Sequence, residues 1–166
     1  MVALPPWSRD RLLEALDDVK DPEVPVLSVV ELGIVRDAVP EGAGAVVTIT
    51  PTYSGCPAMR EIERGIRDAL GARGLEPIET RTKYAPAWTT DWISTEARAK
   101  LAAYGIAPPG AARAADVVQL ERRPRVACPR CSSRDTTLTS EFGSTACKAL
   151  WVCRSCGEPF EEFKPI

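Results

Sequence analysis

The stretch CKALWVCRSC (residues 147–156) decides how the C-terminal part of the chain folds. Its last two cysteines, Cys153 and Cys156, form a C-x-x-C pair, and an upstream pair is formed by Cys128 and Cys131. Two such turns can direct four thiolates at one ion and complete a tetrahedron around zinc, at about 2.3 Å per sulfur. Strand-like segments between the pairs would bring the two turns together. The sequence therefore predicts a zinc ribbon over residues 117–166, with these four cysteines as metal ligands.

Other uses of this pattern fit in part. A rubredoxin-type iron site can use the same two pairs, so the spacing leaves zinc versus iron open. A thioredoxin-type redox pair would need a surrounding βαβ pattern, which neither C-x-x-C has. Four thiolates leave no open coordination position, and a module of about 50 residues buries too little surface to be stable alone. We therefore expect a structural ion whose binding energy contributes to folding.

The third cysteine of the stretch, Cys147, is expected to pack rather than to bind the ion. If residues 147–153 form a strand, its Cα lies about 20 Å from that of Cys153, at about 3.3 Å per residue. One zinc cannot hold both. Cys147 shares a strand face with Ala149 and Trp151, which favours the role of a small apolar residue.

Composition narrows the possible functions. The chain has 166 residues, six cysteines, no histidine and a formal net charge of −2. Without histidine, the chain cannot form a Ser–His–Asp triad, a Cys–His dyad or a histidine-bound catalytic metal site. Neither a signal peptide nor a membrane span is apparent, and the C-x-x-C pairs indicate metal ligands rather than disulfides. A cytoplasmic protein that does not act at the membrane is therefore expected.

The charge of the predicted ribbon argues against nucleic-acid binding. Residues 117–166 contain eight Lys or Arg and six Asp or Glu, an excess of two positive charges. A Zn(Cys)₄ centre contributes −2 and cancels that excess, so no net field remains to attract phosphates. The segment GEPFEEF (157–163) places acidic and aromatic residues together, which suits a protein partner better than DNA. An arginine stripe at 122–134 leaves nucleic acid as a minor alternative.

Residues 1–106 mix helical and strand patterns, which is typical of a compact α+β domain. Ser8 can cap a helix whose apolar face extends to Val19, and Ser28 with Glu31 forms a capping box. The remaining predicted elements are a hairpin (34–50), a helix (56–74) with Pro57 in its first position, a strand (76–85) and a helix that begins at Ser94 or Thr95 and ends at Gly105. The proline-containing segment 107–116 is expected to be a linker.

Cys56 directly precedes the predicted helix 56–74. Unpaired amides and the dipole at a helix N-terminus favour a thiolate, so we expect a lowered thiol pKa. The residues alone do not distinguish a functional thiol from a half-buried cap residue. The acidic motif DPE (21–23) is equally open, because it suits both a turn and a functional acidic pair.

Three motifs occur in an order and spacing that resemble a known family. DPEVPVLSVVELGIV (21–35), VTITPTYSGCP (47–57) and KYAPAWTTDWIS (83–94) are similar to iron–sulfur cluster assembly proteins related to SufT. The resemblance covers roughly residues 8–106. The C-terminal string FGSTACKALWVCRSCGEPFEEFK (142–164) resembles the PaaD family, the accessory D subunits of the bacterial phenylacetyl-CoA epoxidase system.

This resemblance implies a set of functional positions. Cys56 matches the family's cysteine before the long helix, Asp21 and Glu23 match its acidic motif, and Thr50 and Thr52 match its threonines. In the family these positions form a surface cleft, with the cysteine as the proposed functional thiol. Ser54 stands where the broader family often has proline, a mild departure.

The resemblance also implies a function and partners. It implies a role in maturing iron–sulfur or other metal centres of the epoxidase system, with the reductase or oxygenase subunits as partners. Structural zinc and, as transient cargo, an iron–sulfur cluster or iron are the implied cofactors. A purely structural adaptor of the same complex is the alternative. A non-catalytic accessory protein agrees with the sequence, which lacks the Glu-x-x-His pairs of diiron bundles and any Gly-rich phosphate loop.

Overall fold

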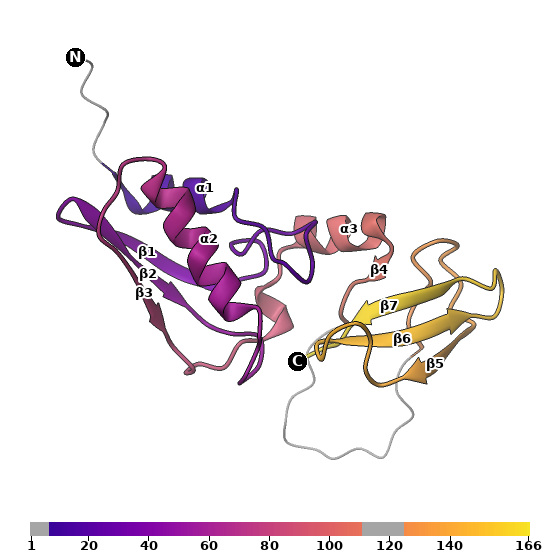
Figure 1. The fold of residues 1–166 in the computed structure, drawn as a ribbon. Coiled ribbons are helices and arrows are strands. Elements are labelled where there is room, and N and C mark those ends of the chain that lie inside the picture. The colour runs from indigo at the N-terminus through magenta and orange to yellow at the C-terminus, as the bar shows by residue number, and fades with distance from the viewer. Residues whose placement is uncertain (1–6, 111–124) are drawn as a thin grey trace. The chain divides into compact units, whose positions relative to one another are not determined.

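The computed structural model describes residues 7–110 and 125–166, and the chain divides into two compact units, residues 1–88 and 89–166 (Figure 1). The part of the predicted linker from residue 111 onward lies outside the described residues. The predicted α+β class is confirmed, since helices and strands occur in both units. No helix within the described ranges combines the length and the apolar composition needed to cross a membrane.

The first unit begins with helix α1 (Arg9–Leu16), as the sequence predicts. The Ser8 hydroxyl accepts a hydrogen bond from the Arg11 amide at 3.3 Å, which caps the helix. Leu12 and Leu16 are fully buried. The predicted helical face extended too far, because α1 ends at Leu16 and Val19 lies beyond it, although Val19 is still buried.

The predicted capping box is present in the turn that follows. The Glu31 amide donates to the Ser28 hydroxyl at 3.0 Å, and the Ser28 amide donates to the Glu31 carboxylate at 2.9 Å. Gly33 closes the turn with a φ of 71°, a left-handed conformation that glycine adopts without strain. This turn leads the chain directly into the first strand.

A three-stranded sheet forms the centre of the first unit. Strands β1 (Val35–Glu41) and β2 (Gly44–Ile49) form the predicted antiparallel hairpin, and β3 (Ile78–Thr82) adds to β2 in parallel, giving the order β1-β2-β3. At Gly44 a Cβ would overlap the carbonyl of Pro77, so only glycine allows β2 and the residues before β3 to lie this close.

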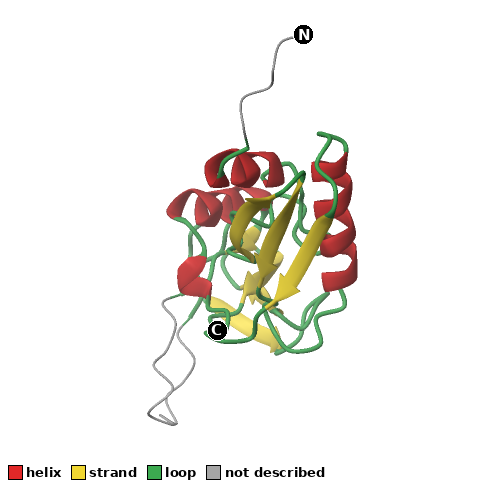
Figure 2. Cartoon of the chain, turned by 90° about the vertical axis from the view of Figure 1, so that its left-hand side faces the viewer, coloured by secondary structure: helices red, strands yellow, loops and turns green. Residues whose placement is uncertain are grey.

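Helix α2 (Met59–Gly71) packs against this sheet and against α1 (Figures 1 and 2). Its buried face consists of Ile62, Ile66 and Leu70, as the helical periodicity predicts. The predicted start was wrong by two to three residues. The helix begins at Met59 with Ala58 as its N-cap, because residues 56–58 form a separate turn.

The second unit contains the short helix η1 (Thr90–Trp92), helix α3 (Thr95–Tyr104) and a four-stranded sheet. Ser94 caps α3 by accepting a hydrogen bond from the Ala97 amide at 3.1 Å. The strands are β4 (Ile106–Ala107), β5 (Thr136–Ser140), β6 (Lys148–Cys153) and β7 (Pro159–Phe163). Their order is β4-β7-β6-β5, with β4 parallel to β7 and the other pairs antiparallel.

The observed division of the chain differs from the expected one. We expected a domain over residues 1–106 and a linker from residue 107, but the first unit ends at Trp88. Ala107 is buried and pairs with Glu162 of β7, so it belongs to the ribbon sheet rather than to a linker. A two-residue strand is too short to produce a period-2 pattern, which explains why the sequence did not reveal it.

Candidate metal centre and the Cys56 site

The four cysteines of the two C-x-x-C pairs converge on one point of the second unit. The Sγ atoms of Cys128, Cys131, Cys153 and Cys156 all lie within 4.8 Å of one another. The Cys128–Cys156 pair is separated by 3.8 Å and the Cys131–Cys153 pair by 3.5 Å. Zinc bonded to four sulfurs at about 2.3 Å requires sulfur–sulfur edges of about 3.8 Å. The donor set therefore fits one tetrahedral ion.

The backbones of the two pairs follow the same path. The amide of the first cysteine donates to the carbonyl five residues later, from Cys128 to Ser133 and from Cys153 to Glu158, both at 2.9 Å. In each pair an amide four residues after the first cysteine donates back to that cysteine's carbonyl, at 2.8 Å and 2.9 Å. Two equivalent turns therefore face each other, and the hydroxyls of Ser133 and Ser155 join them at 2.7 Å.

A left-handed residue completes each turn. Gly157 has a φ of 77°, and Ser132, at the equivalent position of the first pair, has a φ of 62°. Among the described residues Ser132 is the only non-glycine residue with positive φ. This conformation costs of order 1–3 kcal/mol in a non-glycine residue. In the sequence, the contrast between C-x-x-C-S and C-x-x-C-G is the signal for this position.

Backbone amides point at the sulfurs. The amides of Ser133 and Glu158 donate to the Cys131 and Cys156 thiols, respectively. At Cys153, burial opposes ionisation, but the amides of Cys156 and Ser155 and the neighbouring thiols lower its pKa to about 7. Such donors stabilise thiolates, which are the form that binds metal.

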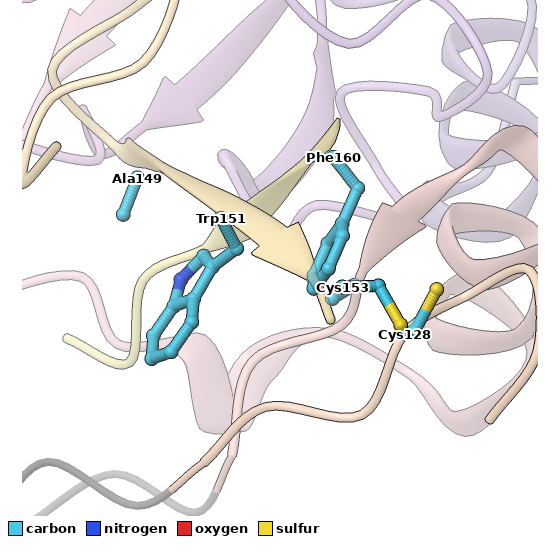
Figure 3. Close-up of a cluster of buried hydrophobic side chains, with 6 residues drawn as sticks. Cys128, Ala149, Trp151, Cys153 and Phe160 are labelled. Carbon is cyan, nitrogen blue, oxygen red and sulfur yellow. The ribbon is translucent and has the colours of Figure 1, made fainter. Parts of the chain in front are cut away.

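The metal centre lies at one end of a small apolar core. Ala149, Trp151 and Cys153 alternate along β6 and face Phe160 of β7 and Cys128 (Figure 3). The Trp151 indole donates to the buried Glu162 carboxylate at 2.8 Å, so its polar atom is also satisfied. Cys153 thus joins the core to the candidate ligands.

Cys147 lies outside the four-sulfur cluster. It is only 3% exposed, and its sulfur contacts the Thr145 hydroxyl at 3.1 Å. It directly precedes β6, and its carbonyl accepts the Lys164 amide at 2.9 Å. These contacts agree with the packing role expected from the strand distance.

In the first unit, Cys56 lies in the turn between β2 and α2. Its amide donates to the Tyr53 carbonyl at 3.2 Å, and its side chain is half-buried. The expected lowering of its pKa is wrong. Burial raises the pKa of the thiol, and the carboxylates of Glu23 and Asp21 raise it further, while the Ala58 amide and the Thr52 hydroxyl act in the opposite direction. Desolvation and two nearby negative charges therefore outweigh the helix start.

These contacts bring together most of the residues that the sequence selected. Glu23, Asp21 and Thr52 all act on the Cys56 thiol. Thr50 is buried at the end of β2, where its amide donates to the Ile34 carbonyl at 2.8 Å. Within the described ranges, the four cysteines of the ribbon are the only group of three or more potential ligand atoms close enough to hold an ion.

The two acids of the DPE motif differ in their surroundings. The Asp21 carboxylate accepts the amides of Glu23 and Val24, both at 2.8 Å, and only 6% of the residue is exposed. Asp21 therefore holds the turn. Glu23 is more exposed and has the larger electrostatic effect on Cys56. The sequence selected both acids but could not separate these two roles.

Comparison with known proteins agrees with this architecture. Residues 9–77 match the model of an iron–sulfur cluster assembly protein family, and residues 112–164 match the PaaD zinc β-ribbon domain. The crystal structure of a domain of unknown function (DUF59) from Bacillus anthracis is 30% identical, with a TM-score of 0.52, and covers 56% of this chain and 90% of its own.

A relative in Escherichia coli strain K12 covers almost the full length. It is described as one of the putative D subunits of 1,2-phenylacetyl-CoA epoxidase and is 49% identical over 151 residues, which are 91% of this chain and 89% of the relative. The match includes both the assembly-like part and the four-cysteine ribbon. The chain therefore belongs to the family of phenylacetyl-CoA epoxidase D subunits.

Proposed function

We propose that this protein is a non-catalytic accessory subunit that assists the maturation of metal centres in a phenylacetyl-CoA epoxidase system. It would act in the cytoplasm, on the reductase or oxygenase subunits of that system. The observation that carries the proposal is the grouping of Cys56, Thr52, Glu23 and Asp21 in a domain that matches iron–sulfur cluster assembly proteins. A thiol beside carboxylates can accept an iron–sulfur cluster or iron as transient cargo.

The raised pKa of Cys56 supports this role. At neutral pH the thiol stays protonated, so it is a weak nucleophile and is protected from alkylation and oxidation. An arriving metal ion would displace the proton and turn the two neighbouring carboxylates from a source of repulsion into a source of attraction. The site would therefore favour metal cargo over covalent catalysis.

The ribbon cysteines would hold a resident zinc ion. The proposed ligands are Cys128, Cys131, Cys153 and Cys156, whose sulfurs fit a tetrahedron. Zinc would supply cross-linking of the two turns and no reaction, because four thiolates fill its coordination sphere. Elemental analysis of the purified protein is expected to give about one zinc per chain. Iron in its place would support the rubredoxin-type alternative.

The test of the maturation role is Cys56→Ala, with Cys147→Ala as a matched control. Epoxidase subunits would be co-produced with each variant, and their iron and acid-labile sulfide would be measured after purification. We expect Cys56→Ala to leave zinc content and subunit binding unchanged but to lower iron or sulfide occupancy. The control should support full occupancy. Full occupancy with Cys56→Ala would instead favour the structural adaptor.

A further inference from the structure

The turn between β5 and β6 presents an aromatic side chain to solvent. Phe142 is 65% exposed, whereas Phe160 and Phe163 of the same unit are buried. Leu150, which pairs with Ser140 at the base of this turn, is also exposed at 37%. Exposed apolar side chains beside one another on a small domain often mark a binding surface.

Hydrogen bonds fix the backbone on both sides of Phe142. The Ser140 hydroxyl accepts the Phe142 amide at 3.2 Å and donates to the Phe142 carbonyl at 2.8 Å. The next amide, of Gly143, donates to the Lys148 carbonyl at 2.7 Å. The aromatic ring is therefore presented from an ordered turn, which reduces the entropy lost when a partner binds.

Glu161 of β7 anchors the same turn from below. Its carboxylate accepts the Ser144 amide at 2.7 Å and pairs with the Lys148 ammonium at 2.8 Å. The Lys148 side chain is only 5% exposed, so the ion pair is almost fully shielded from water. A Cβ on Gly143 would lie 2.7 Å from the Glu161 carboxylate and 3.2 Å from the Lys148 Cβ. The turn is thus packed tightly onto the sheet.

A cation without an ion-pair partner lies beside the aromatic ring. The Lys164 ammonium is 4.6 Å from the centroid of the Phe142 ring, and it donates to the Glu141 carbonyl at 3.2 Å. Among the residues described, no carboxylate lies within ion-pair distance of it. A ring and an unpaired positive charge therefore occur together at the surface, and both would be complemented by an apolar pocket bordered by a carboxylate.

We propose that Phe142 and Lys164 form the anchor by which the ribbon docks on another protein, whose surface offers an apolar pocket with an Asp or Glu at its rim. This rests on the proposed function, because the expected partner is a subunit of the epoxidase system. Phe142 fills the pocket and Lys164 pairs with the acid. Aromatic residues presented in this way commonly dominate the binding energy of an interface.

The test measures binding of the purified epoxidase subunits to full-length, zinc-loaded protein. Phe142→Ser and Lys164→Glu are each expected to raise Kd at least about tenfold. Tyr104→Ser is the control, since Tyr104 is an aromatic residue that is 57% exposed in the same unit. The control should stay within about twofold of the unmodified protein. Zinc content and thermal midpoint should be unchanged in all three variants.

A photo-reactive phenylalanine at position 142 identifies the surface that is touched. Cross-links to an apolar pocket next to an Asp or Glu of one subunit would support the proposal, and reversing that acid to Lys should restore binding by Lys164→Glu. Unchanged affinity of Phe142→Ser, or cross-links to a second copy of this chain, a nucleic acid or a membrane, would overturn it. If Phe142→Ser binds normally while Cys56→Ala still lowers metal occupancy, the docking inference fails and the maturation role stands.

Discussion

Replacing Gly44 by alanine should destabilise the first unit by about 2–4 kcal/mol. The new Cβ would lie 2.7 Å from the Pro77 carbonyl carbon and 2.8 Å from its nitrogen, far inside van der Waals contact. To relieve the overlap, β2 must move away from Pro77, which breaks the hydrogen bonds from Ala45 to Pro77 (3.1 Å) and from Glu76 to Ala43 (3.2 Å). Each lost bond costs about 1 kcal/mol, and overpacking adds about 1–3 kcal/mol. The lower entropy of the unfolded alanine variant offsets about 0.4–1 kcal/mol.

Two other glycines provide matched controls for the same substitution. At Gly71 in α2 the nearest neighbours of a Cβ are the Glu76 carboxylate at 3.9 Å and the Ile78 Cδ1 at 4.0 Å. Gly71→Ala should therefore stabilise the unit by about 0.5–1 kcal/mol through helix propensity. At Gly65 a Cβ would meet Val19 Cγ1 at 3.0 Å. That contact should cancel most of the propensity gain and leave stability nearly unchanged.

The assay is urea unfolding of the zinc-saturated full chain, with hydrogen-exchange mass spectrometry on peptides from β1, β2 and β3 to isolate the first unit. The expected order of stability is Gly71→Ala, then Gly65→Ala, then Gly44→Ala. A Gly44→Ala variant within about 0.5 kcal/mol of the unmodified protein would refute the close approach of β2 to Pro77.

Three further outcomes concern the cysteines. Cys147→Ala should retain full zinc content and lose about 1 kcal/mol of stability, and a halved zinc content would place its thiol in the cluster after all. Glu23→Gln should speed the alkylation of Cys56 by iodoacetamide at neutral pH, because removing a carboxylate that raises the thiol pKa increases the thiolate fraction; an unchanged or slower rate, read by peptide mass spectrometry, would contradict the electrostatic account. Cys153→Ser should abolish zinc binding and unfold residues 125–166 while the amides of β1–β3 keep their protection from exchange, and simultaneous loss of both units would show that they do not fold independently.

The features that the sequence predicted well depend on local rules. Ser8, the Ser28–Glu31 box and the Ser94 cap are short-range hydrogen-bond patterns, and all are present. The hairpin and the buried face of α2 follow from periodicity. The C-x-x-C spacing likewise predicted four sulfurs that the structure brings together. In each case the residues that set the structure lie close to one another in the chain.

The features that it missed depend on contacts between distant residues. The pKa of Cys56 is set by Glu23 and Asp21, which are more than thirty residues away in the sequence, so a rule about helix starts gave the wrong sign. The Lys148–Glu161 pair is buried only because the turn after β5 covers it. The placement of α3 and β4 in the second unit follows from pairing with β7, which no local pattern encodes.

The two-residue strand β4 also bears on how this family can vary and be divided. The matched ribbon begins at residue 112, yet β7 is bordered by Ile106 and Ala107, which precede it. A ribbon excised at residue 112 would carry all four cysteines but leave one edge of β7 without its hydrogen-bonding neighbour, and bare edges promote association between copies. Excision before η1 would keep that edge covered. Because residues 107 and 125 both belong to this unit, relatives could change the length of the intervening segment at a cost that rises only slowly with length.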